Sequence, residues 1–365
     1  MKIVIDARTL RTSTGRYIER LIHYLQKIDN KNDYVILLKP KDFDGWQPSN
    51  PRFQKVICPY KEYTFAEQIG FKKQLESLHP DLVHFAMVQQ PVWYNSSPVV
   101  TTMQDLTTVR FKNPDKNPVV FWIKQKIYKW VNKKVAKKSS HIITISNFVK
   151  NDLIKFTGVN PEKITVTLES ADELPKGNEP VDELIGKKFI MYIGRPTPHK
   201  NLRRLIDAFA LLQKKYPDLT LALAGKKDSN YARHETYVNE RGIKNVVFTG
   251  FISDEQLRWM YENTAVYCFP SLSEGFGLPG LEAMLHGAPV ASSTATCLPE
   301  THGDAAHYFD PFSVEDIAKS IDDILSDDKL RNELVKKGKK HVKTFSWQRM
   351  AEQTLAVYEK YGRKS

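Results

Sequence analysis

Two glutamates, Glu274 and Glu282, flank a glycine-rich segment in the second half of the chain. The apolar run 265–269 before it predicts a buried strand, and helical spacing from residue 278 to a closing Gly287 predicts a helix. Free backbone N–H groups and the positive end of the helix dipole converge at such a junction, which therefore binds anions. The segment between the glutamates begins Gly275, Phe276, Gly277, Leu278.

The two glutamates are eight residues apart with the bend between them, so we expect them to reach different parts of one ligand. Glu282, beside a phosphate site, is well placed to accept hydrogen bonds from a ribose. Glu274, at the entrance of the loop, would face whatever lies beyond the phosphates. The other interpretation is a capping glutamate and a surface glutamate on an ordinary helix, because glycine-rich turns of this kind are common.

A second loop, residues 194–201, follows the apolar strand predicted at 189–193. Arg195 and Lys200 project from it, and Asn201 is suited to cap the helix that follows. The planar guanidinium of Arg195 and the ammonium of Lys200 both stay cationic, and together they suit a diphosphate. Taken alone, however, the loop could equally be a solvated turn. No Asp-x-Asp pair for Mg²⁺ or Mn²⁺ is evident in the sequence, so the two cations would take a metal's place on a leaving diphosphate.

These loops need a scaffold, and strand and helix signals alternate along the chain in the pattern of parallel sheets covered on both faces. The expected strands are 2–7, 34–39, 81–85, 99–103, 141–145, 164–168, 189–193, 219–224, 246–248, 265–269 and 290–292. The expected helices include 16–28, 64–78, 118–138, 201–215 and 347–361. Because ligands bind at the carboxyl ends of parallel strands, the loops after strands 189–193, 246–248, 265–269 and 290–292 should share one site.

The alternation lapses between residues 173 and 183, which are rich in proline and acidic residues. We therefore expect an α/β protein of two Rossmann-like domains that face each other across a cleft. The predicted parts are an N-terminal domain (1–172), a linker (173–187) and a C-terminal domain (188–345). The last helix, about 346–365, is expected to return to the N-terminal domain.

Length and composition agree with this organisation. A chain of 365 residues favours two domains, and 41% hydrophobic with 26% charged residues is typical of a soluble globular protein. No apolar run approaches the roughly 18–20 residues of a membrane span. Asp6 comes too early for a secretory signal, and three cysteines far apart form no metal-ligand spacing, so a cytoplasmic location is expected.

The two loops resemble those of the glycosyltransferases of family 4, also called glycosyltransferase group 1, which have the GT-B fold. The family's Glu-x7-Glu element matches Glu274 and Glu282, and its Gly-Arg-x-x-x-x-Lys-Asn loop matches residues 194–201. Further matching landmarks are Leu298-Pro299-Glu300, Gly303-Asp304-Ala305-Ala306 and Phe309-Asp310-Pro311. The resemblance covers nearly the whole chain.

This resemblance implies a retaining transfer of a hexose, of mannose or glucose type, from a UDP- or GDP-sugar to a glycan or lipid-linked acceptor, with no cofactor or metal. Arg195 and Lys200 would hold the diphosphate and stabilise its leaving charge. Glu274 would contact the donor sugar and Glu282 the ribose, while the N-terminal domain holds the acceptor. The other donor-binding positions that it implies are Gly15, Gly194, Asn201, Gly250, Phe251, Gly275, Phe276, Gly277 and Leu278.

Two positions depart from the family pattern. The first loop has only Gly15 where the family usually has paired glycines. Gln104, before Asp105, replaces the family's histidine; glutamine can donate a hydrogen bond to a sugar but cannot carry a proton. A retaining front-face reaction can pass the acceptor's proton to the departing phosphate, so Gln104 is compatible with catalysis. His84, which ends a nearby strand, is expected either on the acceptor side or as a hydrogen-bonded structural histidine.

The net charge of +12 is concentrated in the first half of the chain. Residues 112–138 hold nine lysines and one acid, with apolar residues at helical spacing between them. One interpretation is a helix packed on its sheet with a solvated lysine face. The other is a face that lies on an anionic membrane, with Trp122 or Trp130 at the interface. Nothing resembles a nucleic-acid recognition motif, so a nucleic-acid partner is not expected.

Three functional hypotheses remain open on the sequence. The first is a retaining glycosyltransferase with a lipid-linked or polysaccharide acceptor, peripheral on the inner face of a membrane. The second is a transferase that acts on a small soluble acceptor such as a sugar phosphate. The third is a nucleotide-sugar-binding pseudoenzyme or binding module, silenced by Gln104.

Overall fold

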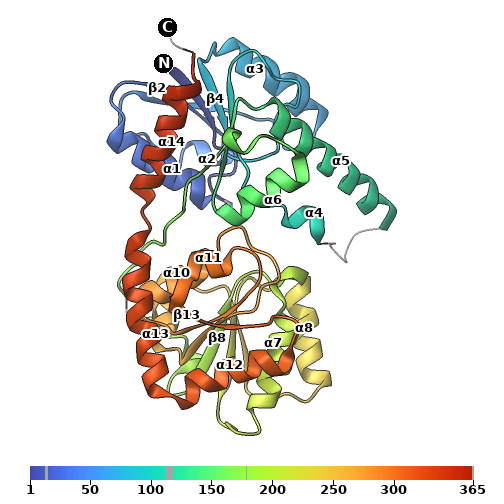
Figure 1. Ribbon diagram of the computed structural model, residues 1–365, viewed down its shortest axis with the longest axis vertical. Helices are drawn as coiled ribbons and strands as arrows, with labels where there is room; N and C mark the ends of the chain where they lie inside the picture. Colours follow the sequence, from blue (N-terminus) through green and yellow to red (C-terminus); the bar gives the residue numbers. More distant parts are fainter. Residues whose placement is uncertain (13–14, 112–117, 178, 364–365) are drawn as a thin grey trace. The chain divides into compact units, whose positions relative to one another are not determined.

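The computed structural model describes residues 1–12, 15–111, 118–177 and 179–363. They form two compact units, each a parallel sheet with helices on both faces (Figure 1). The first unit contains the first sheet and the C-terminal segment from Ser346, and the second extends from Ser170 to Phe345. The α/β class and the two Rossmann-like sheets that the sequence predicts are confirmed.

The sheet of the first unit has seven strands among the described residues, in the order β3-β2-β1-β4-β5-β6-β7. They are β1 (Lys2–Asp6), β2 (Asp33–Leu38), β3 (Phe53–Ile57), β4 (Leu82–Phe85), β5 (Val99–Thr102), β6 (His141–Thr144) and β7 (Ile164–Val166). β1 pairs with both β2 and β4, so the strand order reverses there, and ligands of such sheets bind at this switch point. The edge strand β3 was not predicted from the sequence.

Helices of the first unit cover both faces of this sheet (Figure 1). They are α1 (Arg16–Ile28), α2 (Pro40–Phe43), α3 (Lys72–Ser77), α4 (Thr107–Arg110), α5 (Pro118–Lys138), α6 (Asn147–Thr157) and α14 (Trp347–Tyr361). The helix expected at 64–78 is present over residues 65–77, and it contains a π-helical turn, Glu67–Phe71, that continues into α3. Such π-turns are rare and often occur at functional sites.

The second sheet has the order β10-β9-β8-β11-β12-β13. Its strands are β8 (Phe189–Ile193), β9 (Thr220–Ala224), β10 (Val246–Gly250), β11 (Val266–Phe269), β12 (Val290–Ser293) and β13 (Ala306–Phe309). Here the order reverses between β8 and β11, which are neighbours. The loops that follow these two strands are those of Lys200 and Glu274, so the topology alone brings the two predicted loops to one place.

The helices of the second unit are α7 (Leu202–Leu212), α8 (Ser229–Glu240), α9 (Asp254–Asn263), α10 (Leu278–Leu285), α11 (Leu298–His302), α12 (Val314–Ser326) and α13 (Asp328–His341). α7 and α12 pack against each other through a core that includes Leu205, Phe209, Ile317 and Ile321, all fully buried. Each such side chain stabilises the fold by roughly 1.5–3 kcal/mol through burial. This core fixes the sheet edge that carries the loops.

The segment expected to be a linker packs against the second unit. Leu174, Val181 and Leu184 are buried, and the backbone N–H of Leu174 donates to His286 Nε2 at 3.2 Å. A short 3₁₀ turn spans Asp182–Leu184. The described residues of this segment are therefore held by side-chain packing, and the second unit begins at Ser170.

The last helix, α14, packs beside α1 in the first unit, as expected from the sequence (Figure 1). Its Tyr358 hydroxyl hydrogen-bonds His84 Nδ1 at 2.5 Å, and His84 Nε2 meets Thr102 Oγ1 at 2.8 Å. The rings of His141 and Tyr361 stack with centroids 4.3 Å apart. Two histidines, one on β4 and one on β6, thus fasten the C-terminal helix to the first sheet.

Lowering the pH should weaken this attachment. Burial lowers the pKa of His84 to about 3, whereas a histidine in an unfolded chain has a pKa of about 6.5. Between these values the unfolded chain binds a proton that the folded chain refuses, so stability is lost as pH falls from about 6.5, by about 1.4 kcal/mol per unit. Urea unfolding at about pH 7 and about pH 5.5 measures this loss.

The matched variant is His84→Gln, which retains hydrogen-bonding groups but does not titrate. The wild-type protein should lose about 1 kcal/mol more than this variant between the two pH values. Equal losses would contradict a neutral, buried His84.

Candidate active site

The glycine-rich loop between β11 and α10 is held by side chains from α11. Thr301 Oγ1 donates to the carbonyl of Phe276 at 2.7 Å, and His302 Nε2 lies 3.2 Å from the carbonyl of Gly277. Burial lowers the pKa of His302 to about 4, so the ring is neutral and donates through Nε2 while Nδ1 faces Ser292 Oγ at 3.2 Å. The loop backbone is therefore fixed before any ligand binds.

Gly277 is required by the turn into α10. Its φ of +98° is unfavourable for residues with a side chain, and a Cβ there would lie 2.7 Å from Leu298 Cδ2. As predicted, the helix begins at Leu278 with Pro279 in its first turn. The ring of Phe276 packs edge-on against Phe345, so this ring serves packing, whereas the backbone of the loop forms the turn.

The loop after β8 is bonded directly to the glycine-rich loop. The backbone N–H of Leu272 donates to the carbonyl of His199 at 2.7 Å. Asn201 Nδ2 donates to the carbonyls of Pro270, at 3.0 Å, and Pro311, at 2.7 Å. The sequence suggested that the Asn201 side chain caps α7, but it makes no capping hydrogen bond. Asn201 instead adopts φ +60° and ties three loops together.

These bonds bring Lys200 and Glu274 into contact. Lys200 Nζ lies 2.6 Å from Glu274 Oε1, and the two side chains are 21% and 13% exposed. The N–H of Glu274 donates to Thr296 Oγ1 at 3.1 Å, so the loop after β12 supports the same residue. Burial and the neighbouring Lys200 lower the pKa of His199 to about 4, which leaves Lys200 as the cation of this loop tip.

Arg195 lies in the same loop, close to α8. Its Nε donates to Asp228 Oδ2 at 2.9 Å, and its side chain is 71% exposed. Asp228 also caps α8 through the N–H groups of Asn230 and Tyr231. Although desolvation acts to raise it, these hydrogen bonds keep the pKa of Asp228 below its ordinary value. The ion pair therefore holds the guanidinium beside Asp228, and the exposure of the side chain leaves it room to turn towards an anion.

The other residues that the sequence analysis predicts for donor binding in this unit lie at the same carboxyl edge. Glu282, in α10, is buried, and its Oε2 lies 3.5 Å from the Tyr261 hydroxyl. Gly194 follows β8 directly, and Gly250 ends β10. Phe251, the next residue, is 83% exposed and presents a ring on which a flat base can stack. The second unit thus gathers cations, carboxylates and an aromatic ring at one end of its sheet.

In the first unit, Gln104 and Asp105 line a cavity of about 160 Å³, here called the polar cavity. It lies where β1, β4 and β5 end, at the switch point of the first sheet, and its other walls include Thr9, Thr102 and Gln89. Asp105 Oδ1 accepts from the N–H of Thr107 at 2.7 Å, which begins α4. The sequence singled out Gln104 and Asp105 but not the walls around them.

Gly15 and His84 serve the structure around this cavity. Gly15 starts α1, and a Cβ there would overlap the carbonyl oxygens of Thr9 and Leu10. His84 is fully buried, and both of its ring nitrogens are bonded within the core. The expectation that His84 faces the acceptor is therefore corrected: the structural alternative holds, because its imidazole joins β4 to α14 and β5.

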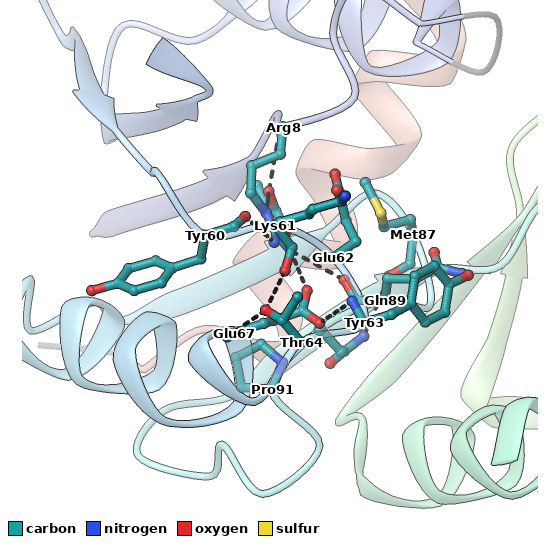
Figure 2. Close-up of polar contacts among 12 residues, drawn as sticks. Arg8, Tyr60, Lys61, Glu62, Tyr63, Thr64, Glu67, Met87, Gln89 and Pro91 are labelled. Atoms are coloured by element: carbon teal, nitrogen blue, oxygen red, sulfur yellow. Dashed lines mark hydrogen bonds and ion pairs between the residues drawn. The ribbon is translucent and has the colours of Figure 1, made fainter.

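A buried ionic network beside the polar cavity was missed by sequence reasoning. Arg8 forms ion pairs with Asp6 (2.8 Å) and Glu67 (2.9 Å). It also donates to the carbonyls of Tyr60 (3.1 Å) and Gln89 (3.2 Å), which lie around it with Glu67 in Figure 2. Glu67 Oε2 accepts from the N–H of Tyr63. One guanidinium thus joins the ends of β1, β3 and β4. The early Asp-x-Arg pair was its only trace in the sequence.

Two families of sequences match the two halves of the chain. The model of "Glycosyltransferase Family 4" matches residues 14–168, and that of "Glycosyl transferases group 1" matches residues 177–341. The chain belongs to glycosyltransferase family 4. It is 32% identical to the O-antigen chain mannosyltransferase B of Escherichia coli over 60% of either chain. It is 30% identical to the MMP alpha-(1->4)-mannosyltransferase of Mycolicibacterium hassiacum over 72% of this chain and 65% of that one.

The matches to these two relatives span less than two thirds of their length. Solved structures of other proteins agree over nearly the whole chain. Sucrose-phosphate synthase from Thermosynechococcus elongatus superposes with a TM-score of 0.79 at 19% identity, covering 99% of this chain and 98% of that one. Anabaena Alr3699/HepE in complex with UDP-glucose gives 0.74 at 16% identity, with coverage of 99% and 100%. The two Rossmann-like units of this family 4 chain are those of the GT-B fold.

Two surveys of the described residues bear on the sequence-based expectations. No group of three or more His, Cys, Asp or Glu side chains among them is arranged to hold a metal ion. Within the same residues, no helix combines the length and apolar character needed to cross a bilayer.

The crowding around Gly277 can be tested against a second glycine with a similar backbone. Gly186 also has positive φ (+71°), but a Cβ there would meet nothing within 4 Å. Gly186→Ala should cost only the backbone strain, about 1 kcal/mol, whereas Gly277→Ala should cost about 1–3 kcal/mol more because Leu298 must move. Chemical unfolding of both variants measures the difference. Similar losses would show that the glycine loop yields easily.

Proposed function

We propose that this protein is a retaining glycosyltransferase that transfers mannose from a nucleotide diphosphate sugar to a glycan or lipid-linked acceptor. The observation that carries the proposal is the 2.6 Å contact between Lys200 and Glu274 at the switch point of the second sheet. It places a cation suited to a diphosphate against a carboxylate suited to sugar hydroxyls. These two groups lie side by side in a donor, where the anomeric carbon joins the phosphate.

In this proposal the donor separates Lys200 from Glu274 and binds to both. A diphosphate oxygen takes the place of Glu274 on Lys200, and the carboxylate of Glu274 then accepts hydrogen bonds from the sugar. Arg195 swings from Asp228 to the same diphosphate, so two cations stabilise the charge that grows as the leaving group departs. The N–H groups at the start of α10 add to the same field, and Glu282 receives the ribose.

The transfer step needs no protonatable side chain at position 104. The acceptor hydroxyl oxygen bonds to the anomeric carbon while the bond from that carbon to the phosphate oxygen breaks on the same face. The departing phosphate oxygen takes the acceptor's proton. Gln104, in the polar cavity, is assigned to orient a sugar oxygen through its amide. Asp105 beside it is assigned to the acceptor.

The choice of mannose is supported by the two relatives described above, both of which are named as mannosyltransferases. We place the base of the nucleotide at Gly250 and Phe251, where the Phe251 ring can stack on either uracil or guanine. Seven lysines and no acidic residue on α5 support a location against an anionic membrane surface on the cytoplasmic side.

The phosphate assignment predicts which variants lose donor binding. A panel of UDP- and GDP-hexoses is screened by thermal shift, and the true donor at about 100 times its Kd should stabilise the protein by about 2.7 kcal/mol. Arg195→Ala and Lys200→Ala should each abolish this shift. The control is Lys215→Ala, which removes a lysine paired with Asp322 at 2.7 Å on the exposed side of the same unit. Unchanged donor binding in both loop variants would refute the assignment.

Turnover separates an enzyme from a binding module. With the donor found by thermal shift, the wild-type protein should slowly release the free nucleotide, because water can replace the acceptor. Glu274→Gln should lower this release by about 10²-fold or more, since one group that contacts the transition state is lost. Tight donor binding without any hydrolysis or transfer would favour the pseudoenzyme instead.

A further inference from the structure

A second cavity in the first unit, here called the apolar groove, has no role in the chemistry described so far. Its volume is about 360 Å³, and its walls come from the segment after β3, the segment after β4, and α5. Phe65, Trp93, Ile127 and Trp130 line it. These side chains are 87%, 58%, 55% and 48% exposed, and the Trp93 and Trp130 rings have centroids 6.2 Å apart.

Exposure of this kind is unusual for a folded unit. Apolar side chains scattered singly on a surface need no explanation, but four large ones that line one cavity mark a binding site. The walls of the groove are also held together by hydrogen bonds. Lys138 Nζ, on α5, donates to the carbonyls of Pro91 at 2.6 Å and Tyr94 at 3.4 Å, and so holds the Trp93 segment against the helix.

The apolar groove continues the polar cavity. Gln89 lines both, and its side-chain amide donates to the Tyr63 hydroxyl at their common wall (Figure 2). Tyr63 has a φ of +64°, a strained conformation that its N–H bond to Glu67 helps to hold. The buried Arg8 network therefore positions the wall between a polar compartment and an apolar one, and one ligand with a polar head and an apolar tail can fill both.

The helix that forms one wall of the groove is basic, although no lysine or arginine is among the described residues that line either cavity. Glu67 is the only acid among the described residues that line it, and it is buried against Arg8. On α5, Lys134 follows Trp130 by one turn, and Lys126, Lys129 and Lys133 are exposed on the same helix. A protein partner would account for the apolar side chains but not for their continuity with the candidate acceptor cavity. An amphiphile with a phosphorylated head accounts for the rings, the lysines and the continuity together.

We propose that the apolar groove binds the hydrocarbon tail of a lipid-phosphate acceptor whose polar head lies in the polar cavity at Gln104 and Asp105. This inference rests on the proposed transferase function and selects the lipid-linked class among its acceptors. Trp93, Trp130 and Phe65 contact the hydrocarbon chain. The exposed lysines elsewhere on α5 make the surface beside the groove positive, which favours an amphiphile that carries a phosphate.

The test uses calorimetric titration of the full chain with farnesyl phosphate below its micellar concentration and, in parallel, with inorganic phosphate. Wild-type protein should bind farnesyl phosphate at least about tenfold more tightly, because the apolar tail adds buried area. Trp130→Ala, in α5, and Phe65→Ala, in the segment after β3, should each weaken this binding about tenfold or more. Both side chains are exposed, so neither variant removes part of the core.

The matched control is Trp122→Ala. Trp122 is 57% exposed on the same helix but does not line the groove, so its loss should change affinity by less than about twofold. If Trp122→Ala weakens binding as much as Trp130→Ala, the helix surface and not the groove takes the lipid, and the proposal fails. Equal affinity for farnesyl phosphate and inorganic phosphate overturns it as well.

Donor binding is measured on the same samples. The groove variants should keep the wild-type thermal shift with the nucleotide sugar, because the groove lies in the first unit and the donor residues lie in the second. A normal donor shift with no lipid binding refutes the groove alone. If no nucleotide sugar shifts the melting temperature of the wild-type protein, the transferase function is refuted. The calorimetric comparison then decides the lipid site independently.

Discussion

The candidate active site depends on one short backbone hydrogen bond, from the N–H of Leu272 to the carbonyl of His199. It joins the loops after two neighbouring strands at the point where the strand order of the second sheet reverses. Lys200 follows His199 and Glu274 lies two residues beyond Leu272, so the bond sets the separation of the ion pair. Asn201, with its amide on two further carbonyls, keeps the loops from separating when the ion pair opens. Rigid backbone here leaves only side chains to rearrange around a ligand.

Much of this arrangement could be predicted because it is local in sequence. α1, α5, α14 and β8 have the predicted bounds, since each is a continuous periodic or apolar run. The edge strands β3 and β13 could not be found in this way. β3 is half exposed and carries Gln54 and Lys55, and β13 has only four residues, one of them His307. An edge strand needs no unbroken apolar pattern, because only part of it faces a core.

The polar interior of the first unit could not be predicted, because its partners are far apart in the chain. Arg8 meets the carbonyl of Gln89, 81 residues away, and His84 meets Tyr358, 274 residues away. No spacing rule reveals such pairs. A histidine at the end of a parallel strand was reasonably expected near a ligand, but the C-terminal helix covers it. The residues that line both cavities of the first unit are also far apart in sequence, so they could not be predicted together. Gln104 and Asp105 could be placed because they directly follow a predicted strand.

The attachment of α14 also has a consequence for how the protein is made. The first unit is discontinuous: its sheet is complete once β7 has been synthesised, but the helix that shields His84 and packs beside α1 comes from the last residues of the chain. Domains generally fold as units while the ribosome delivers the chain from its N-terminus. The second unit has all of its residues before the first one does, so it can reach its final state earlier. The synthesis of α14, rather than the emergence of the first sheet, then marks the point at which the first unit can complete its core.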